Sequence, residues 1–399
     1  MNRPIHEHVS REELLRWTID LVSTPSYSGL PNQEAGVGAY IKGVFDREGI
    51  ECRIVPLRDG RCNVYARLPG AGGGRSLMLN GHMDTVPAYG MDHAFEPWLD
   101  DEGRLHGRGT SDMKGPLAAM MGALVAIKRS GVKLCGDLLY CAVADEEEGS
   151  LGTIALVEEG LRADAAIVGE PTGTGRIAIT QKGLEWFQFD FTGRTVHGGA
   201  YREGVNAIFK AVKFIGALQT RLVPELEKRV LPLVGESTLN VGVIRGGTQL
   251  STVAGECSVQ LDRRFVPGLE TYESCVAELR ALADSLAAQD PDFKYEMKVL
   301  ESSVMEKGYV HQGFAQSPDD PFVLAVKRGV EKALGIDARL VGCPCWTDAG
   351  LLAHYGNMPV VIYGPGEMAC AHSKEECIAL DELEEAMRAY VAIEEGFCG

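Results

Sequence analysis

Short, mostly apolar segments that alternate with helical segments constrain the fold of this chain more than any other feature. Such segments lie at 76–79, 137–144, 165–168 and 359–362. Runs this short and this apolar are typical of strands that are buried on both faces. The segments between them, among them 115–130 and 321–334, have helical character. The alternation predicts an α/β domain in which a mostly parallel or mixed sheet is flanked by helices.

The period of the apolar residues changes near Gly183. Phe187, Phe189 and Phe191 alternate with polar residues, which is typical of a strand with one buried face and one wet face. A helix, two strands, a second helix and a last alternating strand are expected at about 205–222, 237–244, 257–262, 270–288 and 293–299. This β-α-β-β-α-β order is the ferredoxin-like arrangement. We therefore predict an α+β module inserted over 184–301, which divides the first domain into 1–183 and 302–399.

Composition limits the class of protein. The chain has 399 residues, 45% hydrophobic and 24% charged, so it can bury a sizeable core in two or three domains. The net charge, 39 − 56 = −17, argues against nucleic acid or an anionic membrane as a main partner. The 11 cysteines are an odd number without regular spacing, which favours a reducing cytoplasm over a disulfide scaffold. The N-terminal residues lack the apolar core of a signal peptide, and no apolar run approaches the roughly 18 residues of a membrane span.

Residues that could bind a metal ion follow several of the predicted strands. They are His82, Asp84, Asp112, the acidic run 145–148, Glu170 and His372. Ligand sites in open α/β sheets lie beyond the carboxyl ends of the strands. Taken singly, each residue has an ordinary alternative explanation. His82 could be satisfied by its neighbours, Asp112 could cap a helix, the acidic run could be a solvated loop, and His372 could be an idle loop residue.

Taken together, these residues form a consistent set of metal donors. Two histidines with several carboxylates suit Zn²⁺ or Co²⁺ better than Mg²⁺ or copper. Such a set is large enough for two ions with a bridging carboxylate, and ions about 3.5–4 Å apart can activate a water and polarise a carbonyl. Asp84, two residues after His82, can hold the other nitrogen of its ring. Within the acidic run 145–148, chemistry alone leaves open by one residue which glutamate is a ligand and which is a base.

The chain also resembles a known family, through five motifs in a fixed order. They are Gly81-His-Met-Asp-Thr-Val-Pro87, Gly107-Arg-Gly-Thr-Ser-Asp-Met-Lys-Gly115, Asp145-Glu-Glu-Glu-Gly149, Gly169-Glu-Pro-Thr172 and Ala371-His372. Over essentially its whole length the chain resembles the co-catalytic di-zinc amidohydrolases and metallopeptidases. This family includes acetylornithine deacetylase, succinyl-diaminopimelate desuccinylase, aminoacylase-1 and glutamate carboxypeptidase. The resemblance covers the inserted module, which is expected to be a lid and dimerisation domain.

The resemblance implies a role for each residue of the set. The metal ligands would be His82, Asp112, Glu147, Glu170 and His372. Asp112 would bridge two Zn²⁺, for which Co²⁺ is a possible substitute, and Asp84 would orient the His82 ring. Glu146 would be the general base that takes a proton from a metal-bridging water and passes it to the leaving nitrogen. The peptide bond between Asp112 and Met113 is expected to be cis.

Three residues of the inserted module would complete the site. His197 would enter the active site of the partner subunit and stabilise the oxyanion, which implies a homodimer formed through the lid domain. Arg264 would grip a substrate carboxylate, and Ser251 stands where many relatives carry an asparagine that contacts the substrate carbonyl. Tyr201 and Ala254 replace prolines that are usual in the family, which leaves the lid contacts open.

The function implied is the hydrolysis of an amide bond in an N-acyl amino acid, as in acetylornithine deacetylase or succinyl-diaminopimelate desuccinylase. A glutamate-carboxypeptidase-like or dipeptidase activity on a short peptide is the alternative. A catalytically silent metal-binding protein on the same fold is an alternative of another class, although retention of Glu146 beside the ligand set favours an enzyme. The acyl group, the amino acid and the native metal stay open.

Overall fold

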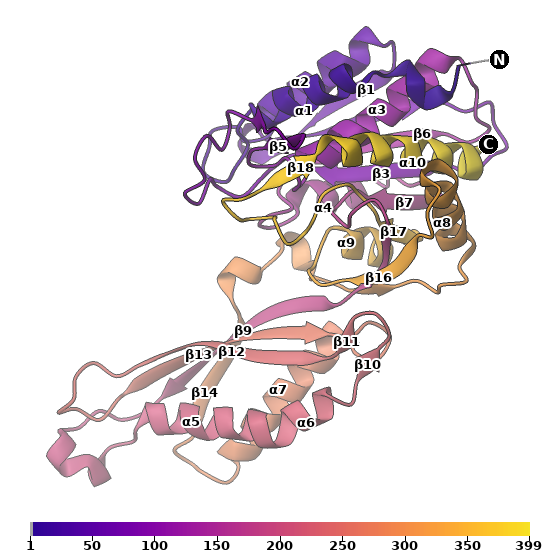
Figure 1. The fold of residues 1–399 in the computed structure, drawn as a ribbon. Coiled ribbons are helices and arrows are strands. Elements are labelled where there is room, and N and C mark those ends of the chain that lie inside the picture. The colour runs from indigo at the N-terminus through magenta and orange to yellow at the C-terminus, as the bar shows by residue number, and fades with distance from the viewer. Residues whose placement is uncertain (1–2) are drawn as a thin grey trace. The chain divides into compact units, whose positions relative to one another are not determined.

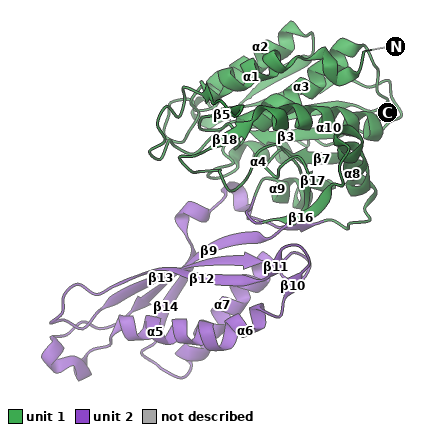
Figure 2. Cartoon of the chain, viewed as in Figure 1, with its two compact units in different colours: residues 1–180, 316–343, 347–399 green, residues 181–315, 344–346 purple. Residues whose placement is uncertain are grey.

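The computed structural model describes residues 3–399, which form two compact units (Figure 2). Unit 1 contains the chain up to Thr180 together with Gln316–Cys343 and Thr347–Gly399. Unit 2 contains Gln181–Ala315 and Pro344–Trp346. Unit 2 therefore extends past residue 301, the expected end of the insertion. The physical reason is that the segment after residue 299 returns along β9 (Gly183–Thr192), where the Leu184 amide donates to the His311 carbonyl at 2.9 Å.

Unit 1 is built on a mixed sheet. Its strands are β1 (Glu51–Pro56), β2 (Cys62–Leu68), β3 (Leu77–His82), β6 (Leu138–Val143), β7 (Ala165–Val168), β8 (Arg176–Gln181), β16 (Arg339–Cys343) and β17 (Val360–Ile362). Their order in space is β1-β2-β6-β3-β7-β17-β8, and β16 pairs with β8. The central strands β6, β3, β7 and β17 run parallel to one another. At the edges of this group, β2 pairs antiparallel with β6, β1 pairs antiparallel with β2, and β8 pairs antiparallel with β17. Every residue of β3 and β6 is buried. The predicted mostly parallel or mixed sheet is confirmed.

Helices cover this sheet. They are α1 (Arg11–Val22), α2 (Ala35–Arg47), α3 (Lys114–Ser130), α4 (Leu151–Glu158), α8 (Pro321–Leu334), α9 (Ala349–His354) and α10 (Leu380–Cys398). Helix α10 packs against both α3 and α8, and α4 packs against α9 (Figure 1). The capping box that starts α1, formed by Ser10 and Glu13, is present as expected. No helix within residues 3–399 has both the length and the apolar character that crossing a membrane requires.

A small three-stranded sheet in unit 1 was not expected from the sequence. Its strands β4 (Trp98–Leu99), β5 (Arg104–His106) and β18 (Cys377–Ala379) lie in the order β18-β5-β4. Strands of two or three residues are too short to show a periodic pattern, so sequence analysis could not detect them. This sheet brings the segment before α10 beside the loop that leads into α3.

Unit 2 has the predicted β-α-β-β-α-β order. Besides β9 it contains α5 (Ala207–Ala217), α6 (Val223–Leu226), the short pair β10 (Val230–Leu231) and β11 (Gly235–Glu236), β12 (Thr238–Gly246), β13 (Glu256–Phe265), α7 (Tyr272–Ala287) and β14 (Lys294–Val299). The four long strands form an antiparallel sheet in the order β12-β13-β9-β14. Phe187, Phe189 and Phe191 face a buried core shared with Phe214 of α5. The alternating pattern of β9 thus marks one buried and one wet face, as predicted.

Candidate metal centre

His82 is the last residue of β3, and Asp84 follows in the loop beyond the strand. The ring of His82 is 1% exposed and is held from both sides. Its Nδ1 lies 2.9 Å from the backbone carbonyl oxygen of Asp84 and 3.5 Å from the Asp84 carboxylate. Its Nε2 lies 3.0 Å from Asp112 Oδ1 and 3.7 Å from Glu170 Oε1. With Nδ1 engaged by Asp84, Nε2 is the nitrogen left to face the two carboxylates.

Asp112 lies between two groups of possible metal ligands. Its Oδ1 faces His82, and its Oδ2 lies 3.2 Å from Nε2 of His372, which is itself 3.0 Å from Glu147 Oε2. The structure thus forms one triad of His82, Asp112 and Glu170 and a second triad of Asp112, Glu147 and His372, each with its ligand atoms within 4.8 Å of one another. The peptide bond between Asp112 and Met113 is cis, as expected.

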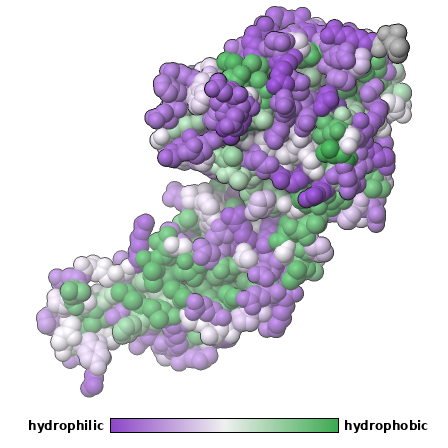
Figure 3. Space-filling model, in the orientation of Figure 1, coloured by the Kyte–Doolittle hydropathy of each residue, from purple (hydrophilic) through white to green (hydrophobic). Residues whose placement is uncertain are grey.

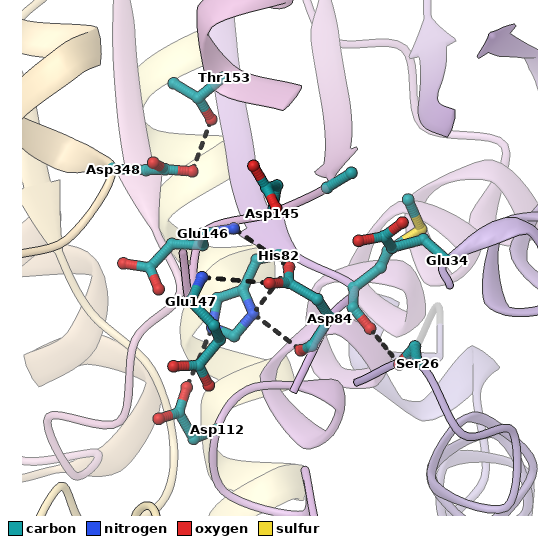
Figure 4. Close-up of polar contacts among 12 residues, drawn as sticks. Ser26, Glu34, His82, Asp84, Asp112, Asp145, Glu146, Glu147, Thr153 and Asp348 are labelled. Atoms are coloured by element: carbon teal, nitrogen blue, oxygen red, sulfur yellow. Dashed lines mark hydrogen bonds and ion pairs between the residues drawn. The ribbon is translucent and has the colours of Figure 1, made fainter. Parts of the chain in front are cut away.

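The acidic loop after β6 is fixed to the same place by Asp84. The Asp84 carboxylate accepts hydrogen bonds from the backbone amides of Glu146, at 3.2 Å, and Glu147, at 3.1 Å. Figure 4 shows the Glu147 carboxylate turned toward Asp112 and the Glu146 carboxylate turned aside from it. Glu148 is exposed. Of the glutamates in this loop, Glu147 is therefore the one placed with the other donors, and Glu146 is its neighbour beside the site.

The electrostatics of the two triads favour a positive charge between the carboxylates. Burial, followed by the charge of Asp112, raises the pKa of Glu147, and burial together with Glu170 raises the pKa of Glu146. The hydrogen bonds that the His372 ring donates to the carboxylates of Asp112 and Glu147 raise the pKa of His372 to about 10. Glu147 Oε1 is buried and has no hydrogen-bond partner among the described residues. Buried carboxylates that crowd together in this way are stabilised by bound cations.

A network of buried ion pairs holds the first residue of the acidic run 145–148. The guanidinium of Arg61, which is 7% exposed, donates to Glu34 Oε2 at 2.9 Å and also to the Asp145 carboxylate. Asp145 accepts in turn from the amide of Leu151 at 3.2 Å. Its own backbone is left-handed, with φ 75°, a conformation that a non-glycine residue keeps only when its surroundings hold it. The network connects the starts of α2 and β2 to the residue that precedes Glu146.

Glu376 is a functional candidate that the sequence analysis missed. Its carboxylate is fully buried and accepts hydrogen bonds from the amides of Gly109, Ser111 and Asp112, each at 3.0 Å. It also pairs with the buried guanidinium of Arg108. These bonds fix the turn that presents Asp112. The available signal was the second of two consecutive glutamates, Glu375 and Glu376, shortly after His372, and such a pair is too common to interpret by itself.

Two further positions lie beside the ligands. A Cβ atom on Gly364, just after β17, would lie 2.2 Å from the Gly169 carbonyl oxygen and 2.7 Å from that of Glu170, so this close approach requires glycine. Asp348 is buried and accepts a hydrogen bond from the Thr153 hydroxyl at 2.6 Å (Figure 4). Burial raises the pKa of Asp348 to about 6.

In unit 2 the structure brings two of the predicted residues together. His197 is exposed, and its Nδ1 accepts a hydrogen bond from the Gly199 amide at 3.1 Å. The neighbouring amide, that of Gly198, donates to the Ser251 carbonyl oxygen at 2.6 Å. The loop of His197 and the loop of Ser251 are therefore joined. The side-chain roles expected of both residues stay predictions.

Arg264 lies at the other end of the sheet of unit 2, near the end of β13. Its guanidinium makes two bonds to Asp262, at 2.8 and 3.0 Å, and the same carboxylate accepts from the Trp186 indole at 3.1 Å. The adjacent Arg263 is fully buried and bonds to Glu270 and Ser237. Of the two arginines, Arg264 is the one with an accessible side chain, and its expected role in binding a substrate carboxylate stays a prediction.

Comparisons with known proteins indicate the family to which the chain belongs. Residues 78–395 match the sequence profile of peptidase family M20/M25/M40. The chain is 28% identical to N-formyl-4-amino-5-aminomethyl-2-methylpyrimidine deformylase of Bacillus subtilis, over 96% of this chain and 94% of that protein. It is 30% identical to acetylornithine deacetylase of Proteus mirabilis, over 88% and 86%. The solved aminopeptidase PepT from Bacillus cereus has the same fold, with a TM-score of 0.81, 24% identity and coverage of 98% and 100%. The resemblance seen in the motifs is confirmed, and the chain belongs to peptidase family M20/M25/M40, a family of metal-dependent hydrolases.

Proposed function

We propose that this protein is a di-zinc amidohydrolase that removes an acyl group from the nitrogen of a small substrate. The first candidate substrate is an N-acyl amino acid. The observation that carries the proposal is the pair of triads that share Asp112. His82 and Glu170 would hold one ion and Glu147 and His372 the other. The donors are two imidazoles and three carboxylates, which is a set that Zn²⁺ accepts, and Co²⁺ is a possible substitute.

Glu146 is proposed as the general base. When bound, the two ions would acidify a water molecule and polarise the amide carbonyl. Glu146 would accept the proton and then donate it to the leaving nitrogen, which requires a carboxylate near the site that is not itself a ligand. Its backbone amide is fixed by Asp84 and its side chain lies apart from Asp112. Burial and the charge of Glu170 raise its pKa, which suits a group that must take up a proton.

The test compares two glutamates of one loop. Glu146→Gln is expected to retain both metal ions and to lose at least about 10²-fold in kcat, because general acid–base catalysis contributes roughly 10²–10⁴-fold to the rate. Glu148→Gln, an exposed neighbour, is the matched control and should keep near-normal turnover. Metal content is measured by elemental analysis and turnover by amine release. Loss of metal from the Glu146 variant would show that Glu146 is a ligand and would overturn the assignment.

The substrate is identified with a panel. It contains N-acetyl, N-succinyl, N-formyl and N-carbamoyl amino acids together with dipeptides. Activity that is abolished by a chelator and restored by Zn²⁺ or Co²⁺ supports the amidohydrolase. Preference for dipeptides would instead indicate the glutamate-carboxypeptidase-like or dipeptidase alternative. Metal binding without turnover of any compound would indicate a catalytically silent metal-binding protein.

Deformylation is a second candidate within the same chemistry. It is favoured by the 28% identity to the pyrimidine deformylase, which extends over nearly the whole chain. An N-formylated aminomethylpyrimidine therefore belongs in the panel beside N-formyl amino acids. Arg264 bears on the choice, because its proposed role is to bind a substrate carboxylate and the pyrimidine has none. Arg264→Ala should impair hydrolysis of the amino acid derivatives while sparing the pyrimidine if both fit the site.

We further propose a homodimer formed through unit 2, in which His197 completes the active site of the partner subunit. Phe209 and Val212 of α5 are 69% and 54% exposed, and Ile244 of the edge strand β12 is 48% exposed. Figure 3 shows apolar residues on this face of unit 2. An unpaired edge strand beside exposed apolar residues can pair with a second copy. Phe209→Glu should reduce the mass measured by light scattering to that of a monomer.

The proposed location is the cytoplasm. The sequence has eleven cysteines, an odd number without regular spacing, which is typical of a reducing compartment rather than of a disulfide scaffold. Ser251 is proposed to lie near the substrate carbonyl, because its loop is joined to that of His197. The proposed substrates are small molecules, and the net charge of −17 speaks against nucleic acid and anionic membranes as partners.

A further inference from the structure

An open cavity lies in unit 1 where the N-terminal segment meets the ends of two helices and one side of a third. Its volume is about 690 Å³. Its walls are η1 (Ile5–His8) with the residues before it, the end of α3, the last turn of α8 and the C-terminal half of α10. Figure 1 shows these segments together near both chain ends. Asp112 precedes the opposite end of α3, and a helix of 17 residues is about 25 Å long. The cavity is thus separate from the metal centre.

Three cationic side chains and one anionic side chain line this cavity, in a chain whose net charge is −17. The cations are Arg3, Lys332 and Arg388 and the anion is Glu395, and the histidines His6 and His8 also line the cavity. Two of the cations have acidic neighbours only at long distances. Arg3 Nε lies 3.8 Å from Glu7, and Lys332 Nζ lies 3.9 Å from Glu395. Both distances exceed that of a hydrogen bond, so neither pair fixes its cation firmly.

Arg388 has no acidic partner among residues 3–399. Its Nε is buried and makes no hydrogen bond. Buried donors in native proteins are nearly always paired. Arg388 as a whole is partly exposed and lines the cavity, so a partner for its guanidinium would have to come from the cavity. The charge of Arg388 acts together with burial to lower the pKa of His6 across the cavity. A guanidinium presents two parallel N–H groups that match a carboxylate or a phosphate.

The remaining wall is apolar and includes Ile5, Val391 and Ala392. Inorganic ions would leave this surface uncovered, whereas a ligand with a hydrocarbon part would bury it. We infer that this cavity binds a small organic anion, a carboxylate or phosphate head on a short apolar body, with Arg388 holding the oxyanion. The inference is independent of the proposed amidohydrolase activity, because none of the proposed metal ligands lines the cavity.

The test is isothermal titration calorimetry on the metal-loaded full chain. The probes are hexanoate, hexyl phosphate and 1-hexanol, which share an apolar chain and differ in the head group. At least one of the two anions should bind saturably, whereas hexanol should not. The anion that binds identifies whether the cavity prefers a carboxylate or a phosphate head group. Arg388→Gln should weaken that binding about tenfold or more, because a charge-assisted bidentate pair is lost. Arg388→Lys keeps the positive charge but loses the two parallel N–H donors of the guanidinium, so it should weaken the binding of the anion less than Arg388→Gln does.

The matched control is Arg328→Gln, an exposed arginine of α8 that does not line the cavity. It should bind like the original protein. Hydrolytic activity should be unchanged in both glutamine variants, which separates this site from the metal centre. The His6 ring signals in an NMR titration should move with the binding isotherm. Absence of saturable binding by both anions, equal binding of hexanol, or full binding in the Arg388→Gln variant would each overturn the inference.

Discussion

Replacing Arg61 by methionine tests whether the buried ion network supports the catalytic loop. Arg61 is 7% exposed, and its partners Glu34 and Asp145 are 0% and 3% exposed. Methionine keeps much of the side-chain volume but removes the charge. Two buried carboxylates then lose their counter-ion, and one of them immediately precedes Glu146. The variant should therefore lose both stability and turnover.

The magnitude follows from burial. Removing one partner of a buried ion pair costs roughly 3–5 kcal/mol, because a charge is left uncompensated. Burial already raises the pKa of Glu34 and of Asp145 with Arg61 in place. A carboxyl group whose pKa is raised on folding binds its proton more tightly in the folded state, so its stability contribution grows as the pH falls. The defect of the variant should hence be largest above neutral pH and should shrink on acidification toward pH 5.

The assay is urea denaturation of the chelated protein at pH 8 and at pH 5, followed by circular dichroism. Arg53→Met is the matched control, since Arg53 pairs with Glu159 at the surface with both side chains well exposed. Its effect should stay below about 1 kcal/mol. Turnover of the Arg61 variant with metal restored should fall roughly 10–100-fold, as for other residues that orient ligands. An Arg61 variant no less stable than the Arg53 variant would refute the reasoning.

Three further outcomes are expected. Burial raises the pKa of Glu185 to about 7, so ionisation of this group weakens the fold as the pH rises. Glu185→Gln should therefore raise the free energy of unfolding by on the order of 3 kcal/mol at pH 8 and have little effect near pH 4. Equal effects at both pH values would contradict this. Asp84→Asn should weaken metal affinity roughly 10–100-fold, measured by competition with a chelator, because the His82 ring loses its support; unchanged affinity would show that the backbone carbonyl suffices. His197→Ala should lower kcat while leaving metal content intact, and a normal kcat would remove His197 from the mechanism.

Much of the architecture was predictable because the positions of apolar residues along the sequence follow regular patterns. The central strands β3, β6 and β7 are wholly buried and mostly apolar, and the alternation in β9 marks its two faces. Such patterns report burial, which is what forms these elements. The strands β4, β5 and β18 were missed because two or three residues are too few to show a periodic pattern, and β18 pairs with β5 from a distant part of the chain.

The candidate ligands were predictable for a different reason. His82, Asp112, Glu147, Glu170 and His372 each lie in a motif, and the structure brings their side chains together at one edge of the sheet. Their supports were not predictable. Glu376 contacts residues 264 to 267 positions earlier in the chain, and Arg61 contacts Asp145 across 84 positions. Hydrogen bonds over such separations leave no local pattern in a single sequence.

The most direct measurement of the central claim is anomalous diffraction from crystals of the protein loaded with Zn²⁺, recorded on both sides of the zinc absorption edge. The account predicts two peaks about 3.5–4 Å apart, one beside His82 and Glu170 and one beside Glu147 and His372, with Asp112 between them. Crystals of the Asp112→Asn variant should lose at least one peak. A single peak in the unaltered protein, or zinc bound away from Asp112, would contradict the account.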